Sequence, residues 1–408
     1  MTKLRTITLV VALCHSLAGC QIVGQVVDLF HTSESQTVSG EAPLWSRLST
    51  QGLAGTEGHL GEVLTIKQVA RDPIQVLSVG TDGNLITWDL ESGAGSILKT
   101  LDSPCQLAAL GENRSLVACA SGFSVRVACV TGCTGQWELT KLKTRTTSIA
   151  FHEDDSALLI GGADGRVYRW RFRLPETAET LREQEKILER YIAHQTIVTQ
   201  VAPLHTARAF FSADWDGVLY GWLAYTADDQ QGSFDKNLFG GRFFGDIGTY
   251  LRANRATDRG ITALTVSRDG TRLGLGTEDG AIEIWEVRGF LLSARAPLHS
   301  GRVTGIALNN DGTRVASVGR DGKINVSQVV PDPLFGIKVD TLPTHLTQLM
   351  SEEMRGASKI YFLSSGNAIV TTLSGKLGEI PVAAIPAPVE TPPAVLTNKK
   401  QEVRDSDY

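Results

Sequence analysis

The middle of the chain is patterned as a series of short β-strands. Apolar residues alternate with polar ones or run together over short stretches, and each stretch ends near glycine, aspartate or asparagine. Helical spacing of apolar residues is scarce. Because successive side chains of a strand point to opposite faces, this pattern predicts an all-β fold.

One hairpin motif recurs along the chain. It has an apolar strand, an Asp-Gly turn and an alternating strand, and Asp-Gly is a strong hairpin signal because both turn positions tolerate positive φ. Four of the five clear copies place a tryptophan six residues after the aspartate, as in Asp82 with Trp88, Asp164 with Trp170, Asp216 with Trp222, and Asp279 with Trp285. The fifth copy has Ser327 at that offset from Asp321. Two weaker copies, at 115–130 and 368–382, bring the hairpins to seven.

This pattern resembles the WD-repeat family, in which each repeat forms one four-stranded blade of a β-propeller. In that family a histidine, a Ser or Thr, the turn aspartate and the tryptophan form a buried hydrogen-bond relay. The resemblance implies a seven-bladed propeller over residues 43–382. It assigns relays to the first blade (His59, Ser78, Asp82 and Trp88) and the fourth (His194, Ser212, Asp216 and Trp222).

The relay residue types are also those of Ser/His/Asp catalysis. We favour a structural role, because the spacing recurs from blade to blade, including in incomplete copies such as His299, Ser317 and Asp321. The last blade stops after its third strand near Val382, and we expect Leu44–Ser49 to supply its outer strand. Such pairing would seal the ring and leave no exposed edge.

The N-terminus has the features of a bacterial lipoprotein leader. Lys3 and Arg5 precede a short apolar stretch, Ile7–Leu13, which is too short for a stable membrane span. Leu17-Ala18-Gly19-Cys20 resembles a lipobox. The resemblance implies a signal peptide over 1–19, lipidation at Cys20 and a tether over 20–42, and Gln21 points to the periplasmic face of the outer membrane. The Pro-rich, then charged residues 383–408 predict a disordered tail.

Charge and cysteines narrow the range of functions. The net charge is −5, and no basic stripe with interleaved aromatics occurs, which disfavours nucleic-acid binding.

Hairpin geometry favours a disulfide between the first two of four clustered cysteines and a second between the last two, with free thiols or a zinc site as alternatives. The four are Cys105, Cys119, Cys129 and Cys133.

The insertion between Thr226 and Arg259 is the strongest candidate for a partner-binding segment, with self-packing against the ring as the alternative. Aromatic and arginine side chains are typical anchors at protein interfaces. Those in the insertion are Phe234, Phe239, Arg242, Phe243, Phe244 and Tyr250.

No motif for a cofactor, a metal or a nucleophile is present in the sequence. We therefore expect a non-enzymatic scaffold that is anchored by its lipid and docks other envelope proteins. The alternative is an enzyme or small-ligand sensor that uses the central channel of the propeller.

Overall fold

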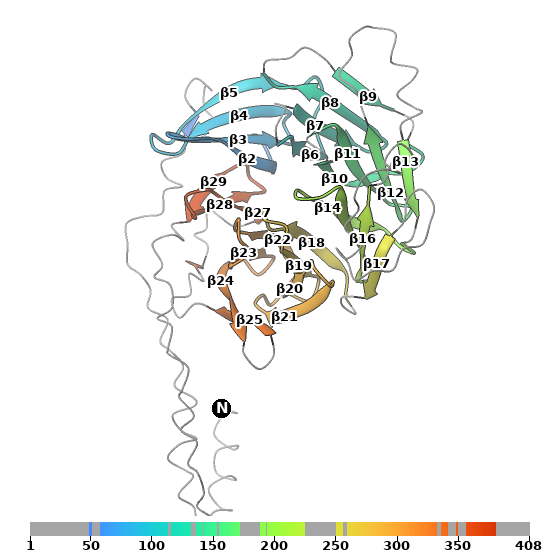
Figure 1. The fold of residues 1–408 in the computed structure, drawn as a ribbon. Coiled ribbons are helices and arrows are strands. Elements are labelled where there is room, and N and C mark those ends of the chain that lie inside the picture. Colours follow the sequence, from blue (N-terminus) through green and yellow to red (C-terminus); the bar gives the residue numbers. More distant parts are fainter. Residues whose placement is uncertain are drawn as a thin grey trace, which may run out of the picture. The chain divides into compact units, whose positions relative to one another are not determined.

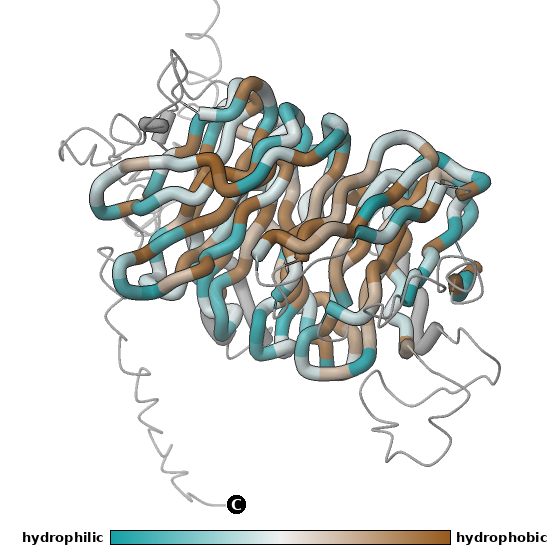
Figure 2. Tube along the Cα trace, turned by 90° about the horizontal axis from the view of Figure 1, so that it is seen from above, coloured by the Kyte–Doolittle hydropathy of each residue, from teal (hydrophilic) through white to brown (hydrophobic). Residues whose placement is uncertain are grey.

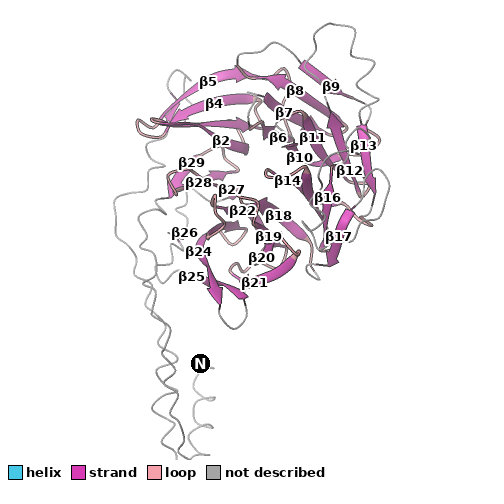
Figure 3. Ribbon diagram, viewed as in Figure 1, coloured by secondary structure: helices cyan, strands magenta, loops and turns pink. Residues whose placement is uncertain are grey.

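The structure is a computed structural model that describes residues 49–50 and 58–380. Gaps within that range lie at 113–115, 132–135, 141, 153–154, 172–187, 193, 225–249, 256–258, 333–335, 342–347 and 350–355. Every regular element in the described residues is a strand (Figure 3). None of the described segments is a helix of the length and apolarity needed to span a membrane.

The strands form seven sheets that radiate from a central axis, as blades of a propeller (Figure 1), and all their pairs are antiparallel except one at the edge of the first sheet. The innermost strands of neighbouring sheets contact one another around the ring, and the first, β2, contacts the last, β27. This is the predicted all-β, seven-bladed arrangement.

The first four blades are built as follows. Blade 1 has β2 (Val63–Arg71), β3 (Ile74–Gly80), β4 (Asn84–Asp89) and β5 (Ala94–Thr100), and blade 2 has β6 (Leu107–Leu110), β7 (Leu116–Ser121), β8 (Ser124–Cys129) and β9 (Gln136–Leu139). Blade 3 has β10 (Thr146–His152), β11 (Ala157–Gly162), β12 (Arg166–Arg171) and β13 (Leu188–Ile192), and blade 4 has β14 (Val198–Leu204), β15 (Ala209–Asp214), β16 (Val218–Leu223) and β17 (Tyr250–Arg255).

The remaining three blades complete the ring. Blade 5 has β18 (Ile261–Val266), β19 (Arg272–Thr277), β20 (Ala281–Glu286) and β21 (Leu291–Pro297). Blade 6 has β22 (Val303–Leu308), β23 (Arg314–Gly319), β24 (Lys323–Asp332), β25 (Gly336–Thr341) and β26 (Gln348–Leu349). Blade 7 has three described strands, β27 (Ala357–Phe362), β28 (Ala368–Thr372) and β29 (Leu377–Ile380).

The hydrophobic core lies between the blades rather than inside any one of them. Seven clusters of buried apolar side chains occur in the described residues, and each joins two neighbouring sheets. Strands such as β11 and β15 are buried along their whole length, and apolar stretches run through the interior of the ring (Figure 2). A sheet covered on both faces explains why the middle strands are continuously apolar while the outer strands alternate.

Blade 7 packs on blade 1 through the same contact that joins blade 5 to blade 6. The N–H of His59 donates to the carbonyl of Gly375, as the N–H of His299 donates to Gly280. Both glycines have positive φ, and a Cβ on Gly375 would lie 2.0 Å from the carbonyl oxygen of His59. Glycine is therefore required there both for its conformation and for the approach of the next blade.

One prediction about ring closure was wrong. Ser49, expected in the outer strand of the last blade, lies instead in β1 (Ser49–Thr50), which pairs in parallel with Ala94 and Gly95 of β5. The outer strand of blade 1 presents an unpaired backbone edge that accepts this short segment. Residues 44–48 lie outside the described residues.

The turn glycines provide a matched test of the closing contact. Gly322 also has positive φ, but a Cβ there meets nothing within 4 Å. We expect Gly322→Ala to cost about 1 kcal/mol of unfolding free energy, from backbone conformation alone. Gly375→Ala should cost more than roughly 3 kcal/mol, because it also separates blade 7 from blade 1. Urea unfolding of both variants measures the difference, and equal losses would argue against closure through Gly375.

Candidate functional site

The four predicted relay residues of blade 1 form one chain of hydrogen bonds. His59 Nδ1 lies 3.0 Å from Asp82 Oδ1, and His59 Nε2 lies 2.8 Å from the Ser78 hydroxyl. The indole N–H of Trp88 donates to the same hydroxyl oxygen over 2.7 Å. His59, Ser78 and Trp88 are buried.

The direction of two hydrogen bonds in the relay follows from what each group is able to donate. An ionised carboxylate only accepts and an indole N–H only donates, so His59 Nδ1 donates to Asp82 and the Ser78 oxygen accepts from Trp88. Burial raises the pKa of Asp82, but hydrogen bonds from His59 and from the N–H groups of Leu60 and Asn84 outweigh it and lower that pKa to about 2. The polar groups of the relay therefore find their partners within blade 1, as those of a structural element do.

Blade 4 has the same relay with one substitution. His194 contacts the Ser212 hydroxyl at 2.6 Å, and Trp222 donates to that hydroxyl over 2.7 Å. The carboxylate on His194 Nδ1 belongs to Asp214, at 2.8 Å, and not to the predicted Asp216. Asp216 is exposed, and its backbone N–H donates to Asp214.

A steric effect explains why Asp214, and not Asp216, contacts the histidine in blade 4. Asp214 stands two residues after the relay serine, where blade 1 has Gly80. A Cβ on Gly80 would approach His59 Nδ1 to 2.4 Å and Asp82 Oδ1 to 2.6 Å. Only one of the two positions can therefore place a carboxylate on the histidine. Asp214 was not predicted from the sequence, although the Ser-x-Asp spacing of Ser212 and Asp214 in blade 4 is a signal that could have identified it.

The other blades depart further from the relay. Blade 6 joins His299 to Ser317 and Asp321, and Ser327 is buried where the tryptophan would stand. In blade 5 the Trp285 indole instead donates to Glu283, whose buried carboxylate has a raised pKa because of burial. A complete relay is therefore not needed in every blade.

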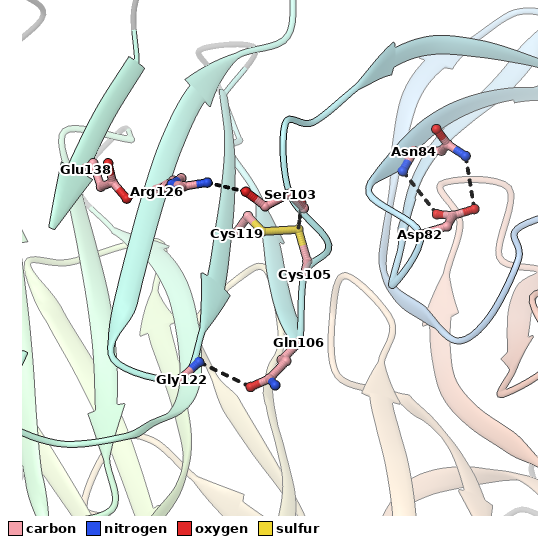
Figure 4. Close-up of a disulfide and its surroundings, with 9 residues drawn as sticks. All are labelled: Asp82, Asn84, Ser103, Cys105, Gln106, Cys119, Gly122, Arg126 and Glu138. Carbon is pink, nitrogen blue, oxygen red and sulfur yellow. Dashed lines mark hydrogen bonds and ion pairs between the residues drawn. A yellow bond between two sulfur atoms is a disulfide. The ribbon is translucent and has the colours of Figure 1, made fainter. Parts of the chain in front are cut away.

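Cys105, which precedes β6, and Cys119 of β7 form a disulfide with Cα atoms 5.4 Å apart (Figure 4). These two positions thus hold a disulfide rather than free thiols or a metal site. Cys129 is also disulfide-bonded, and Cys133 lies outside the described residues.

The aromatic insertion of blade 4 is largely outside the described residues. This applies to Phe234, Phe239, Arg242, Phe243 and Phe244. The backbone of Tyr250 belongs to β17, where it pairs with Trp222 at the outer edge of the sheet. The role predicted for these side chains stays a prediction.

A group of exposed apolar side chains gathers at one end of the ring. They sit where an inner strand begins or where the second strand of a blade turns into the third, and antiparallel pairing brings these positions to the same end. We call this end the turn face. Its large exposed apolar residues are Leu60 (70%), Phe123 (57%), Leu373 (55%), Ile197 (45%) and Trp215 (40%).

Trp215 is supported by a cation from another blade. The guanidinium carbon of Arg302, which precedes β22, lies 5.5 Å from the centroid of the Trp215 ring. Such a cation–π contact holds the indole in place while 40% of the residue stays exposed. Sequence reasoning missed the turn face, because its residues are single apolar side chains within different turns.

The inner strands line a central channel of about 550 Å³. A repeated hydrogen bond joins its walls, in which a threonine at the second position of one inner strand donates to the first carbonyl of the next. It occurs from Thr147 to Val198, from Thr262 to Val303 over 2.6 Å, and from Thr304 to Ala357 over 3.2 Å. These bonds fix the spacing of the blades at the axis.

Comparisons with known proteins agree with this architecture. Residues 295–326 match the WD40 family, described as "WD domain, G-beta repeat". Protein HIR1 of Cryptococcus neoformans var. neoformans is 27% identical over 194 residues, a match that covers 46% of this chain and only 21% of that relative's length. The U5 small nuclear ribonucleoprotein 40 kDa protein of Dictyostelium discoideum is 24% identical over 281 residues, which cover 67% of this chain and 72% of the relative.

Solved structures show the same fold. The WD40 β-propeller domain of Doa1 superposes with a TM-score of 0.55 and 16% identity, covering 79% of this chain and 93% of that one. U3-55K superposes with a TM-score of 0.58 and 15% identity, covering 79% and 96%. The fold and its repeat are therefore those of a WD-repeat β-propeller.

The two aspartates of blade 4 allow a direct test of the relay. We expect Asp214→Asn to lower the unfolding free energy by about 1–3 kcal/mol, because it disturbs a buried hydrogen-bond partner of His194. Asp216→Asn, two residues away and exposed, should change it by less than about 0.5 kcal/mol. Chemical denaturation of the two variants separates these outcomes, and a larger effect at Asp216 would contradict the assignment.

Proposed function

We propose that this protein is a non-enzymatic scaffold that docks a protein partner on its turn face. The observation that carries the proposal is the set of five large apolar side chains exposed at one end of a rigid ring. Single exposed apolar residues are ordinary, whereas a group on one face marks an interaction surface.

The chemistry of the turn face suits protein recognition. Trp215 and Arg302 are of the residue types that dominate binding energy at protein interfaces. The ring holds them on short turns between buried strands, so little side-chain and loop ordering is needed on binding. The Dictyostelium relative is, by its name, part of a ribonucleoprotein particle, which fits the use of such a propeller within an assembly.

We further propose that the chain is anchored by a lipid on Cys20, at the periplasmic face of a bacterial outer membrane, where other envelope proteins are its partners. The lipobox-like Leu17-Ala18-Gly19-Cys20 behind a short apolar stretch supports this location. The disulfide between Cys105 and Cys119 supports it independently, because disulfides persist in oxidising compartments.

Substitutions on the turn face test the docking role. We expect Trp215→Ser combined with Leu60→Ser to remove the proteins captured by proximity labelling in the native cell. Leu291→Ser is the matched control, because Leu291 is 54% exposed but lies at the start of the outer strand of blade 5, at the opposite end of the ring. The set of captured proteins should be unchanged by the control. A role for this face would be contradicted if the double variant captured the same proteins as the wild type. It would also be contradicted if the double variant and the control lost the captured proteins to the same extent.

The anchor is tested by replacing cysteines in the leader. We expect Cys20→Ser to abolish incorporation of labelled fatty acid and to release the chain from the membrane fraction. Cys14→Ser changes a cysteine six residues earlier and should leave both properties intact. Incorporation that survives Cys20→Ser would exclude this residue as the lipid attachment site.

A further inference from the structure

The channel wall carries one lysine where the other blades carry neutral residues. In six of the inner strands the pairing with the second strand of the blade shifts register near the start of the strand. In β27 the first paired residue after this shift is Lys359. The corresponding residues of the other five strands are Thr65, Ser148, Gln200, Ala263 and Gly305. Lys359 is thus the single charged side chain at this level among those six strands.

Lys359 has no partner that satisfies its charge. No hydrogen bond or ion pair to its ammonium occurs within the described part of the chain, although the side chain lines the channel. Burial lowers the pKa of Lys359, the charge of Glu62 opposes that change, and the charge of Arg302 adds to it. An ammonium that lines a channel without a hydrogen-bonded acceptor interacts favourably with an anion that binds beside it.

Lys359 and Arg302 have charged neighbours of both signs. Arg302 lies near a second cation, Arg320, and burial together with that charge lowers the pKa of Arg302. Glu62 and Glu278 are the acidic groups that act on Lys359 and Arg302. Lys359 and Arg302 thus offer two cations to an anion, and Glu62 and Glu278 offset part of their charge.

Contacts between blades cross the ring at the end of the channel away from the turn face. There the turn after β6 is held by blades 1 and 3, because Lys67 donates to the carbonyl of Glu112 over 2.7 Å and Asp155 accepts the Glu112 N–H over 2.7 Å. The Glu112 carboxylate also lies 3.7 Å from Arg268 of blade 5, across the ring. Lys359 follows the start of β27 and therefore lies toward the turn face, away from these contacts.

We propose that the turn-face opening of the channel receives a carboxylate of the docked partner, an acidic side chain or C-terminus, with Lys359 as its counterion. This inference rests on the proposed docking role of the turn face. Arg302 supplies the second cation while it supports Trp215, so that the carboxylate is bound beside an apolar surface. A partner that fits has an acidic residue next to apolar ones.

Peptide selection on the full chain tests this inference. Random peptides displayed on phage are selected against the wild-type protein, and we expect enrichment in aspartate or glutamate. Affinity should fall at least tenfold when the acidic residue of a selected peptide becomes its amide, and at least tenfold for Lys359→Met. Lys359→Arg, which keeps the charge, should retain most of the affinity. Lys338→Met, a change of the same type on the outer strand of blade 6, should be neutral.

A second arm distinguishes a partner's carboxylate from a free one. Glutarate is titrated into the wild-type chain and into Lys359→Met, and the Tm is followed. Stabilisation of the wild type alone, without selection of acidic peptides, would show that the site takes a small carboxylate and would overturn the partner assignment.

Failure of the carboxylate site and failure of the docking role give different results. Peptides whose affinity ignores both the amide change and Lys359→Met would overturn the carboxylate site. If those peptides still lost binding in the Trp215→Ser, Leu60→Ser variant, the docking role of the turn face would stand. An absence of any effect of glutarate or acidic peptides would likewise overturn the carboxylate site.

Discussion

The structure depends on the burial of sheet faces between neighbouring blades. No blade of this chain covers its own faces, and each of the seven apolar clusters is shared by two sheets. An open row of such sheets would leave one apolar face exposed at each end. Packing of Leu363, Ile369 and Leu377 of blade 7 on blade 1 removes both exposed faces at once. The ring is closed by side-chain packing and by the contact between Gly375 and His59.

The repeat made the fold predictable from the sequence. The Asp-Gly turns and the tryptophans located the hairpins, and the His59 relay followed from family resemblance because its residue spacing is local. Asp214 was missed because the turn contains two aspartates and His194 contacts only one of them. Which aspartate reaches the histidine depends on the three-dimensional geometry of the turn. The pairing of Ser49 with β5 was also missed, because an exposed strand edge accepts many short segments and the sequence does not select one.

The candidate site was less predictable than the fold, for a physical reason. The turn face collects single residues from hairpins that lie far apart in sequence, such as Leu60 and Leu373. Lys359 is conspicuous only when the inner strands are aligned by their register shifts, which hydropathy does not show. The rigid ring therefore determines where these side chains gather, and the individual turns determine what they recognise.

Closure of the ring by blade 7 is the central claim, and native-state hydrogen exchange tests it most directly. The inner strands β27 and β2 should open with the same free energy as β10 and β14, because a closed ring loses protection as a unit. Closure through this blade would be contradicted if the amides of β27 exchanged through a separate opening. The free energy of that opening would be lower, by about 2 kcal/mol or more, than the free energy of opening of β10 and β14.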